Sequence, residues 1–368
     1  MKFPFSFDRR YFKHFDYVIL ALIALLTLIG ILTIMGSTVN LSRLHSFGKR
    51  QILWLGVSMV AFGFVIAVDY RVLGRFAFLF YSVINVCLVY LLIKGYAIKG
   101  SASWIAFGSV RFQPSEFAKI AVALFLATHL QDRMGKIYYL RDIFIPCLIV
   151  FFPMCLVILQ PDLGSAAIFV PILLTMLFAA GMRRKLIVLM VLCGIIGVAG
   201  TYPFLKPYQK QRIIVFLNPG HDPLGKGYNL FQSQIALGSG KLTGKGWQKG
   251  TQTALQFLPE HHTDFIFSSY CEQFGVGAAF VLFLAFVILV VRSLAVALEA
   301  GDTFGALLVI GLLSIFISHL LLNIAMTVGL FPVAGVPLPF ISYGGSFLLA
   351  SFITFALICN VGMRKFMF

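Results

Sequence analysis

Residues 16–36 read DYVILALIALLTLIGILTIMG, in which one aspartate is followed by twenty residues without a charge. A helix needs about 20 mostly apolar residues to cross the hydrocarbon core of a bilayer, and this run is that long. The whole chain has the same character, since 60% of its 368 residues are apolar and 11% are charged. Soluble domains carry about 25% charged residues. The composition therefore predicts an integral membrane protein and excludes a soluble enzyme and a disordered or fibrous chain.

Similar apolar runs recur along the chain and predict an all-α membrane fold. We identify about ten of them: 16–36, 51–68, 75–94, 114–131, 143–159, 164–181, 185–203, 265–291, 304–328 and 346–362. We therefore expect one polytopic membrane domain over residues 1–368, with about ten transmembrane helices. A large loop at 204–264 would connect helices 7 and 8.

The positive residues predict the orientation, because Lys and Arg gather in the short cytoplasmic loops of membrane proteins. With a cytoplasmic N-terminus, 15 Lys and Arg lie inside and six lie outside, when the 204–264 loop is set apart. A loop of that length crosses the membrane largely regardless of its charge. Both termini are therefore predicted to be cytoplasmic, and the long loop is predicted to be outside.

The net charge of +16 does not indicate a nucleic-acid partner. The basic residues stand in short clusters between apolar runs, where they set topology or contact the anionic headgroups of membrane lipids. The six cysteines lie in or beside apolar runs without C-x-x-C spacing. They are interpreted as small buried hydrophobic residues, not as a disulfide framework or a metal site.

A first polar cluster on the predicted outer side runs from Trp104 to Lys119. Pro114 suits the first turn of a helix, and Glu116 then lies where the helix dipole favours an anion. Glu116 and Lys119 are three residues apart, so they share one face of the helix about one turn into the membrane. Two interpretations stay open: a structural ion pair that lets both residues enter the bilayer, or a pair that lines a polar cavity.

A second cluster is the short outer turn Gln160-Pro-Asp-Leu-Gly164. Pro, Asp and Gly are ordinary turn residues, and Asp often caps the helix that follows a turn. Capping is the favoured interpretation of Asp162. Its outer position leaves a role in a functional site open.

The long loop is rich in glycine at residues 238–250, GSGKLTGKGWQKG. This segment does not match a nucleotide-binding loop, because Gly246 stands where Walker A needs Ser or Thr and Thr243 replaces the third glycine of GxGxxG. The glycines would still let backbone N–H groups approach an anion closely. Three basic residues of the same loop add positive charge: Lys206, Lys210 and Arg212. Together these features predict a surface suited to a phosphate-bearing ligand.

The loop ends in Pro259-Glu-His-His-Thr-Asp264, directly before an apolar run. The two adjacent histidines suggest a metal ion, but chain neighbours seldom converge on one ion and no third ligand is evident, so no protein metal site is predicted. Asp264 either caps the following helix or is a carboxylate at a half-buried rim, where desolvation makes it a better base. Composition leaves both interpretations open.

A fourth cluster, residues 332–346, reads PVAGVPLPFISYGGS and lies between the last two apolar runs. Three prolines and three glycines interrupt helix formation here. Broken backbone at membrane depth must be shielded from lipid. The segment is therefore predicted to be re-entrant or to line a cavity.

Six motifs in order resemble the SEDS family, over nearly the whole chain. They are Arg111-Phe-Gln-Pro-Ser-Glu-Phe-Ala-Lys119, Gln160-Pro-Asp-Leu-Gly164, Asp222-Pro-Leu-Gly-Lys-Gly-Tyr228, Gly244-Lys-Gly-Trp247, Phe257-Leu-Pro-Glu-His-His-Thr-Asp-Phe265 and Gly335-Val-Pro-Leu-Pro-Phe-Ile-Ser-Tyr-Gly-Gly345. The short N-terminus and the overall length are more similar to the RodA branch than to its division relative FtsW. One departure is Ser103 before Trp104, where the family often has Arg.

The resemblance implies a ten-helix peptidoglycan glycosyltransferase that polymerises lipid II on the outer face of the cytoplasmic (inner) membrane during cell elongation. Its implied partners are a class B penicillin-binding protein that cross-links the strands and other membrane proteins of the elongation complex. By resemblance, Asp264 is the essential aspartate of the outer loop. The expected supporting residues are Glu116, Lys119, Asp162 and Glu260. The expected substrate-binding residues are Trp104, Arg111, Gln113, Arg212, Ser342, Tyr343 and Gly344.

The implied reaction is attack of a sugar hydroxyl on an anomeric carbon that carries a pyrophosphate-linked polyprenyl chain. We expect Asp264 to be the base, and Lys119 and Arg111, with Arg212, to offset charge on the leaving diphosphate. A divalent cation, Mg²⁺ or Mn²⁺, is left open as a cofactor. Two other functions also stay open: a flippase for lipid II, and a non-catalytic scaffold of the elongation complex. The polar motifs gather on the outer side, which favours the enzyme.

Overall fold

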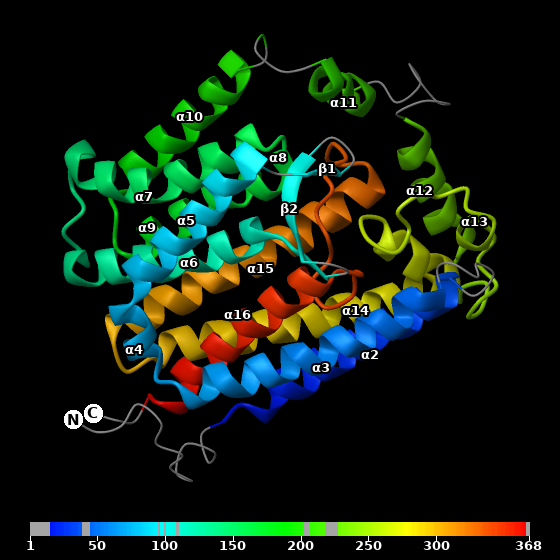
Figure 1. Cartoon of the computed structure of the whole chain (residues 1–368), viewed down its shortest axis with the longest axis horizontal. Coiled ribbons are helices and arrows are strands. Elements are labelled where there is room, and N and C mark those ends of the chain that lie inside the picture. Colours follow the sequence, from blue (N-terminus) through cyan, green and yellow to red (C-terminus); the bar gives the residue numbers. More distant parts are fainter. Residues whose placement is uncertain are drawn as a thin grey trace.

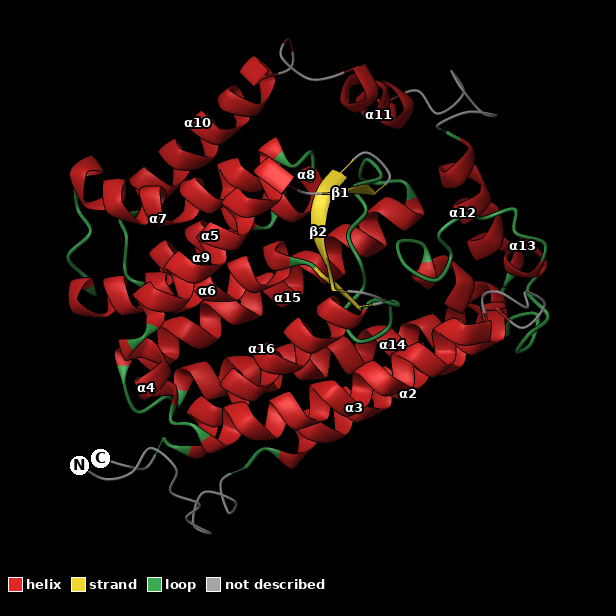
Figure 2. Ribbon diagram, viewed as in Figure 1, coloured by secondary structure: helices red, strands yellow, loops and turns green. Residues whose placement is uncertain are grey.

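The computed structural model describes residues 15–38, 45–94, 96–98, 101–107, 110–201, 203, 207–217 and 227–365. Figure 1 shows a bundle of long helices, and Figure 2 shows that helix dominates the described part of the chain. The elements are α2 (Tyr17–Thr38), α3 (His45–Ala67), α4 (Tyr70–Arg75), α5 (Ala77–Lys94), β1 (Tyr96–Ile98), β2 (Ser101–Phe107), β3 (Val110–Phe112), α6 (Pro114–Leu130), the 3-10 helix η1 (Gln131–Arg133), α7 (Leu140–Leu159), α8 (Leu163–Ala167), α9 (Phe169–Ala179), α10 (Arg184–Thr201), α11 (Pro207–Leu217), α12 (Tyr228–Ser239), α13 (Thr251–Ala254), α14 (Ile266–Leu298), α15 (Thr303–Val328) and α16 (Gly345–Met363). Lys206, Asp222 and the side chain of Arg212 lie outside the described residues.

Each of the ten apolar runs predicted from the sequence forms helix. Within the described ranges, seven helices are long and apolar enough to cross a membrane: α2, α3, α5, α7, α14, α15 and α16. The other three runs correspond to α6, to α8 with α9, and to α10. A multi-pass helical membrane protein is therefore confirmed. The count of ten spans and the cytoplasmic termini stay predictions.

The first and last described residues lie on the same side of the bundle. Phe15 and Lys365 line one cavity of about 170 Å³, together with residues from the end of α14. We call this side the terminal end, and we call the opposite side, which carries residues 240–265 and 332–344, the loop end. An even number of crossings is consistent with this arrangement.

The helices α15 and α16 form the centre of the bundle, as Figure 1 shows. In the most apolar 18 residues of each helix, 89% are buried in α16 and 72% in α15, against 22% in α3. The helix α6 packs beside them with its residues almost entirely buried. By contrast, α10 leans away from the bundle and exposes most of its side chains. Polar side chains on the three central helices must therefore find partners inside the protein.

At the terminal end, polar side chains close the helix ends. Asp302 caps α15 by accepting the Gly305 N–H at 2.6 Å, and it also accepts from Arg71 Nε at 2.9 Å and from the Tyr70 hydroxyl. Burial raises the pKa of Tyr70, and its hydrogen bond to Asp302 raises it further. Asn360 of α16 donates to the carbonyl oxygens at the end of α3. These bonds fasten the α3–α4 turn to the two central helices.

The three-stranded sheet β1–β2–β3 is a feature that the predicted all-α fold does not contain. Its strands pair antiparallel, with Tyr96 opposite Trp104 and Ala106 opposite Arg111. Aromatic and β-branched residues, which have a high strand propensity, stand in all three strands, in a connection too short for another membrane helix, and account for it. The sheet leads directly into α6.

The helix α14 is interrupted at Gly275, whose φ of 82° and ψ of 171° are not helical. The glycine-rich segment supplies the hydrogen bonds that the interruption frees. The Lys245 N–H donates to Glu272 O and the Gly246 N–H donates to Gln273 O, both at 3.0 Å, while Val276 N–H donates to Lys241 O at 2.8 Å. A Cβ on Gly244 would lie 2.2 Å from Gln273 O. These glycines therefore permit close approach to α14, and the N–H groups of Lys245 and Gly246 bind protein carbonyls where an anion was predicted.

Glu272 holds the same segment with its side chain. It is fully buried, and its carboxylate accepts from Lys245 Nζ at 2.9 Å and from the Gln252 N–H at 2.9 Å. Thr251 and Thr253 add hydrogen bonds to the same carboxylate. An anion at the start of α13 also suits the dipole of that short helix. Glu272 is thus a structural residue that organises the segment leading to Asp264.

We expect Gly275→Ala to lower the free energy of unfolding by about 2 kcal/mol or more, because alanine disfavours this φ and its Cβ would lie 2.3 Å from Leu242 O. Gly56→Ala is the control, since its Cβ would meet nothing within 4 Å on α3 and alanine favours a helix by about 0.5–1 kcal/mol. Thermal unfolding of both variants in one detergent tests this. Equal stability of the two variants would contradict the structural account of the α14 break.

Candidate functional site

Asp264 lies at the end of the long loop, with a half-buried side chain. Phe265 occupies the N-cap position of α14, and Asp264 is the residue before it. Its carboxylate faces the segment between α15 and α16. The Oδ2 atom lies 3.5 Å from the point where a Cβ on Gly335 would stand, and Gly335 has a φ of 68°. The glycine therefore lets the backbone pass close to the carboxylate.

The loop before α14 and the segment 332–344 are fastened to each other by buried side chains. Asn323 of α15 donates from Nδ2 to Asp264 O at 2.9 Å and to Val336 O at 2.7 Å. Ser342 donates from Oγ to Thr263 O at 2.7 Å. The backbone around Asp264 is thus fixed from two directions.

The segment 332–344 is irregular and largely buried, as the sequence predicts. Gln51 of α3 donates to Ser342 O at 3.2 Å and accepts the Gly344 N–H at 3.3 Å. Gly30 of α2 allows the backbone of this segment to pack close to the helix, since a Cβ on Gly30 would lie 2.7 Å from Ile341 Cα. Several helices therefore shield this backbone from lipid and satisfy its polar groups.

Asp162 takes the capping role that the sequence favours, and it also contacts a second predicted site residue. It is the N-cap of α8 and accepts the Ser165 N–H at 3.0 Å, so the capping prediction is confirmed. Its other oxygen accepts from Gln113 Nε2 at 3.4 Å. The Gln113 N–H in turn donates to Ser346 Oγ at 3.3 Å. Asp162 is therefore connected to the start of α6 and to the start of α16.

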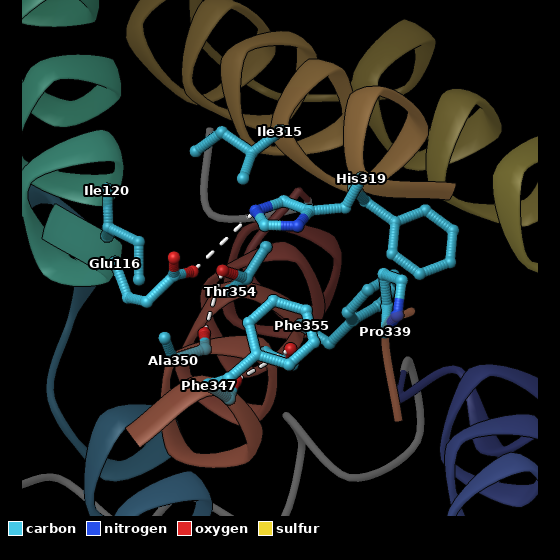
Figure 3. A pocket seen from close by; sticks show the side chains of 11 residues that line it. Glu116, Ile120, Ile315, His319, Pro339, Phe347, Ala350, Thr354 and Phe355 are labelled. Atoms are coloured by element: carbon cyan, nitrogen blue, oxygen red, sulfur yellow. Dashed lines mark hydrogen bonds and ion pairs between the residues drawn. The ribbon is translucent and has the colours of Figure 1, made fainter. Parts of the chain in front are cut away.

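Glu116 and Lys119 form the ion pair that their spacing predicts, with 2.8 Å between Lys119 Nζ and Glu116 Oε1. Lys119 is fully buried, and its Nζ also lies 2.7 Å from His319 Nε2 of α15. Figure 3 shows Glu116 and His319 pointing toward each other across a pocket, with 3.6 Å between Oε2 and Nε2. We call these three residues the buried triad. His319 Nδ1 lies 3.3 Å from Pro337 O, so the triad also touches the 332–344 segment.

The pocket beside the buried triad is small. Its volume is about 20 Å³, and α6, α15 and α16 line it, with apolar residues such as Ile120 and Phe355 among the walls (Figure 3). A space of this size holds about one water molecule. Of the pair, Glu116 lines this pocket and Lys119 does not, and most of the lining residues are apolar, so the pocket is not the polar cavity that the sequence leaves open for both residues.

The remaining predicted residues lie around this centre at different depths. Tyr343 packs on Phe47 with 4.7 Å between ring centroids, and His262 stacks on Phe47 at 4.8 Å. Trp104 is half-buried on β2, and the side chain of Arg111 is exposed on β3. Glu260 shapes the loop, since its carbonyl accepts the Thr263 and Phe265 N–H groups and its carboxylate accepts from Thr263 Oγ1 at 3.2 Å. Glu260 therefore supports the turn that presents Asp264.

The two adjacent histidines do not converge on one point. Their ring centroids are 5.3 Å apart at a 75° interplanar angle, and His262 stacks on Phe47. Among the residues that the structure describes, no group of three or more His, Cys, Asp and Glu is arranged to hold a metal ion. Lys210, one of the basic loop residues, donates to Pro203 O at 2.9 Å.

Sequence reasoning missed two polar residues of α15 that join the parts of the site. His319 and Asn323 are four residues apart, so they lie on one face of the helix. A signal was available, because polar residues within an apolar 26-residue helix are costly and default to functional hypotheses. It also missed Lys49 and Arg50, which are exposed on the first turns of α3 beside Gln51. These two cations lie next to the residue that holds Ser342 and Gly344.

A protein-family model described as a cell cycle protein, FtsW/RodA/SpoVE, matches residues 15–366. The chain belongs to the FtsW/RodA/SpoVE family. This is the SEDS family that the six motifs indicate, so the resemblance is confirmed. Asp264, the buried triad and the 332–344 segment all lie within the part that matches.

Named members of the FtsW/RodA/SpoVE family resemble the chain closely. The peptidoglycan glycosyltransferase MrdB of Escherichia coli is 37% identical over 322 residues, which cover 86% of each chain. A chain of a solved peptidoglycan synthase complex, described as coordinating polymerization and crosslinking, is 27% identical with a TM-score of 0.82, covering 96% of this chain and 98% of that one. The rod shape determining protein RodA of Thermus thermophilus shares the fold, with a TM-score of 0.72 at 23% identity, covering 96% and 98%.

We expect Lys119→Met to destabilise the protein by about 3–5 kcal/mol, because it leaves the Glu116 carboxylate buried without its cation. The double variant Glu116→Gln with Lys119→Met should recover most of this loss. Thermal unfolding and a polymerisation assay on the same samples test both interpretations of the pair. Recovery of stability without activity would make the pair part of the site, whereas recovery of both would make it structural.

Burial lowers the pKa of His261 below its ordinary value of 6.5, against a weaker effect of its hydrogen bond to Leu258 O. The folded loop therefore binds this proton less well than the unfolded chain does. Its stabilising contribution is fully present above pH 6.5 and decreases as the pH falls below that value. We expect His261→Gln to reduce the loss of thermal stability between pH 7 and pH 5. An identical loss in both proteins would contradict this role.

Proposed function

We propose that this chain is a peptidoglycan glycosyltransferase that polymerises lipid II on the outer face of the cytoplasmic membrane during cell elongation. The observation that carries the proposal is the position of Asp264. Its half-buried carboxylate stands at the loop end, on a backbone that Asn323 and Ser342 fasten to the 332–344 segment. The relative MrdB, 37% identical, is named a peptidoglycan glycosyltransferase, which supports the same activity here.

In the proposed reaction, a hydroxyl oxygen of the acceptor sugar attacks the anomeric carbon of the donor. Asp264 accepts the hydroxyl proton. The bond between the anomeric carbon and the diphosphate oxygen breaks, and its electron pair leaves with the polyprenyl diphosphate. Fixing the backbone around Asp264 supports this chemistry, because a base must be held in line with the reacting atoms.

The leaving diphosphate needs positive charge that solvent and substrate can reach. Lys119 is fully buried and contacts Glu116 and His319, so it does not face an incoming substrate in this structure. Arg111 is exposed, and Lys49 and Arg50 are exposed on α3 near the 332–344 segment. We therefore assign the charge-offsetting role to these three cations in place of Lys119.

We place the protein in the inner membrane with both termini cytoplasmic and the loop end outside, where lipid II polymerisation takes place. The proposed partner is a class B penicillin-binding protein that cross-links the strands. The likeness to a chain of a complex that coordinates polymerization and crosslinking supports this pairing. Other membrane proteins of the elongation complex complete the proposed assembly.

A flippase is the alternative function. The small volume of the pocket beside the buried triad does not favour it. The pocket volume of about 20 Å³ is far below that of a disaccharide, and Glu116 beside it is paired with Lys119, so this pocket offers no space for the sugars of lipid II. A scaffold without chemistry predicts that Asp264 is dispensable. The experiment below separates these functions.

We propose that any divalent cation enters the site bound to the substrate and is not a resident cofactor of the protein. The described residues form no cluster of three His, Cys, Asp and Glu ligands, and Mg²⁺ is commonly held by one or two carboxylates together with the phosphates of a substrate. The substrate's diphosphate would therefore carry such an ion. Addition of EDTA to the polymerisation assay, with and without excess Mg²⁺, measures the requirement.

We expect Asp264→Asn to lower lipid II polymerisation about 10²–10⁴-fold, which is the usual contribution of a general base. Glu299→Gln is the matched control, since it makes the same carboxylate-to-amide change at the terminal end, where Glu299 pairs with Lys365. Each purified protein is given labelled lipid II, with and without its cognate penicillin-binding protein, and the glycan strands are resolved on a gel.

Polymer from well-folded Asp264→Asn at the wild-type rate would move the base to another carboxylate, with Asp162 and Glu116 tested first. Absence of polymer from the wild type together with its partner would refute the enzyme. A liposome assay for lipid II translocation would then test the flippase.

A further inference from the structure

We propose that Asn323 is the positioning residue of the base, holding the Asp264 backbone at a fixed place relative to Gly335. The inference rests on the proposed function, because it assigns Asn323 a role that acts through Asp264. Asn323 lies on the buried face of α15 and has no measurable exposure.

The side-chain amide of Asn323 joins two segments that have no regular secondary structure. Its Nδ2 donates to Asp264 O at 2.9 Å and to Val336 O at 2.7 Å. These acceptors are 59 and 13 residues away along the chain. One NH₂ group thus uses both hydrogens to connect the loop before α14 with the segment before α16.

The chemistry of the position favours asparagine. Asparagine provides two donors on a short side chain, whereas an ionised aspartate of the same shape would present oxygen atoms to two carbonyl oxygens. Leucine has a similar size and no donor. Because buried carbonyl groups without partners are costly, loss of this amide would release one or both segments.

The two carbonyls that Asn323 holds belong to the residues that bring Asp264 and Gly335 together. Asp264 itself supplies one carbonyl, and Val336, the neighbour of Gly335, supplies the other. Across this contact, Asp264 Oδ2 lies 3.5 Å from the Cβ position of Gly335. A misplacement of about 1 Å at a reacting group can cost about 100-fold in rate. Asn323 therefore helps to set the position of the proposed base, to which the chemistry is sensitive.

The face of α15 supports this role over two helical turns. His319, four residues before Asn323, lies 3.3 Å from Pro337 O through Nδ1. The backbone at 336–337 is thus held twice from α15, but only the Asn323 contact extends to the residue that carries the proposed base. Asn323 is therefore the residue whose removal should affect Asp264 most directly.

The test compares Asn323→Leu and Asn323→Asp with Thr327→Val, in the full-length protein with its partner. Thr327 is equally buried on α15, and its hydroxyl bonds within its own helix to Ile324 O. We expect both Asn323 variants to lower kcat for lipid II about 10- to 100-fold while KM changes less than about threefold. We expect Thr327→Val to keep the wild-type kcat. The stoichiometry of lipid II binding corrects for any unfolded fraction.

Two further measurements separate positioning from general stability. Hydrogen exchange of the amides at 258–265 and 333–344 should increase in the Asn323 variants, while the amides of α12 and α2 keep their protection. In a double-mutant cycle, Asn323→Leu should cause no further loss when Asp264 is already Asn.

Wild-type kcat in Asn323→Leu, unchanged exchange at these two segments, or a full additional loss in the Asp264→Asn background would each overturn the positioning role. Failure of the proposed function has a different signature, namely no polymer from the wild type together with its partner. Full polymerisation by Asp264→Asn would keep the enzyme and remove Asp264 as its base.

Discussion

Irregular backbone inside a membrane protein must find its hydrogen-bond partners within the protein, because lipid offers none. This constraint governs the loop end. Glu272 binds the N–H groups at the start of α13, Gln51 binds both sides of the turn before α16, and Asn323 holds two carbonyls at once. The side chains that satisfy the backbone are also those that place the proposed base. Structural and functional demands therefore meet in the same few polar residues.

The buried triad satisfies the same constraint with charged groups. Lys119 enters the bundle with a carboxylate on one side and an imidazole on the other, and Pro337 O lies against the far side of the ring. An isolated charge at this depth would be very costly, whereas a paired one is tolerated. The helix α15 thus connects the membrane-buried charges to the segment that faces Asp264, through residues four apart on one face.

The sequence predicts the local features of this protein well, since runs of apolar residues, a three-residue spacing and a turn motif depend only on near neighbours. The helices, the Glu116–Lys119 pair and the Asp162 cap are of this kind. Features that depend on contacts far apart in the sequence were missed or misjudged. The glycines at 240–250 were expected to face an anion. Instead, a segment of α14 some 30 residues later in the chain lies against them and accepts hydrogen bonds from the N–H groups of their segment. His319 and Asn323 have partners up to 200 residues away, which periodicity does not reveal.

The interruption at Gly275 also bears on how the protein meets bilayers of different thickness. The helical part after it, Val276–Leu298, is about 35 Å long at 1.5 Å per residue, which is enough for a hydrocarbon core of about 30 Å with some tilt. The part before it, which follows Asp264, is held by the Lys245 and Gly246 N–H groups, and the part after it is held by the carbonyls of Lys241 and Leu242, so one glycine-rich segment joins both sides of the break. A tilt of Val276–Leu298 that corrects hydrophobic mismatch therefore acts on the segment that leads to Asp264.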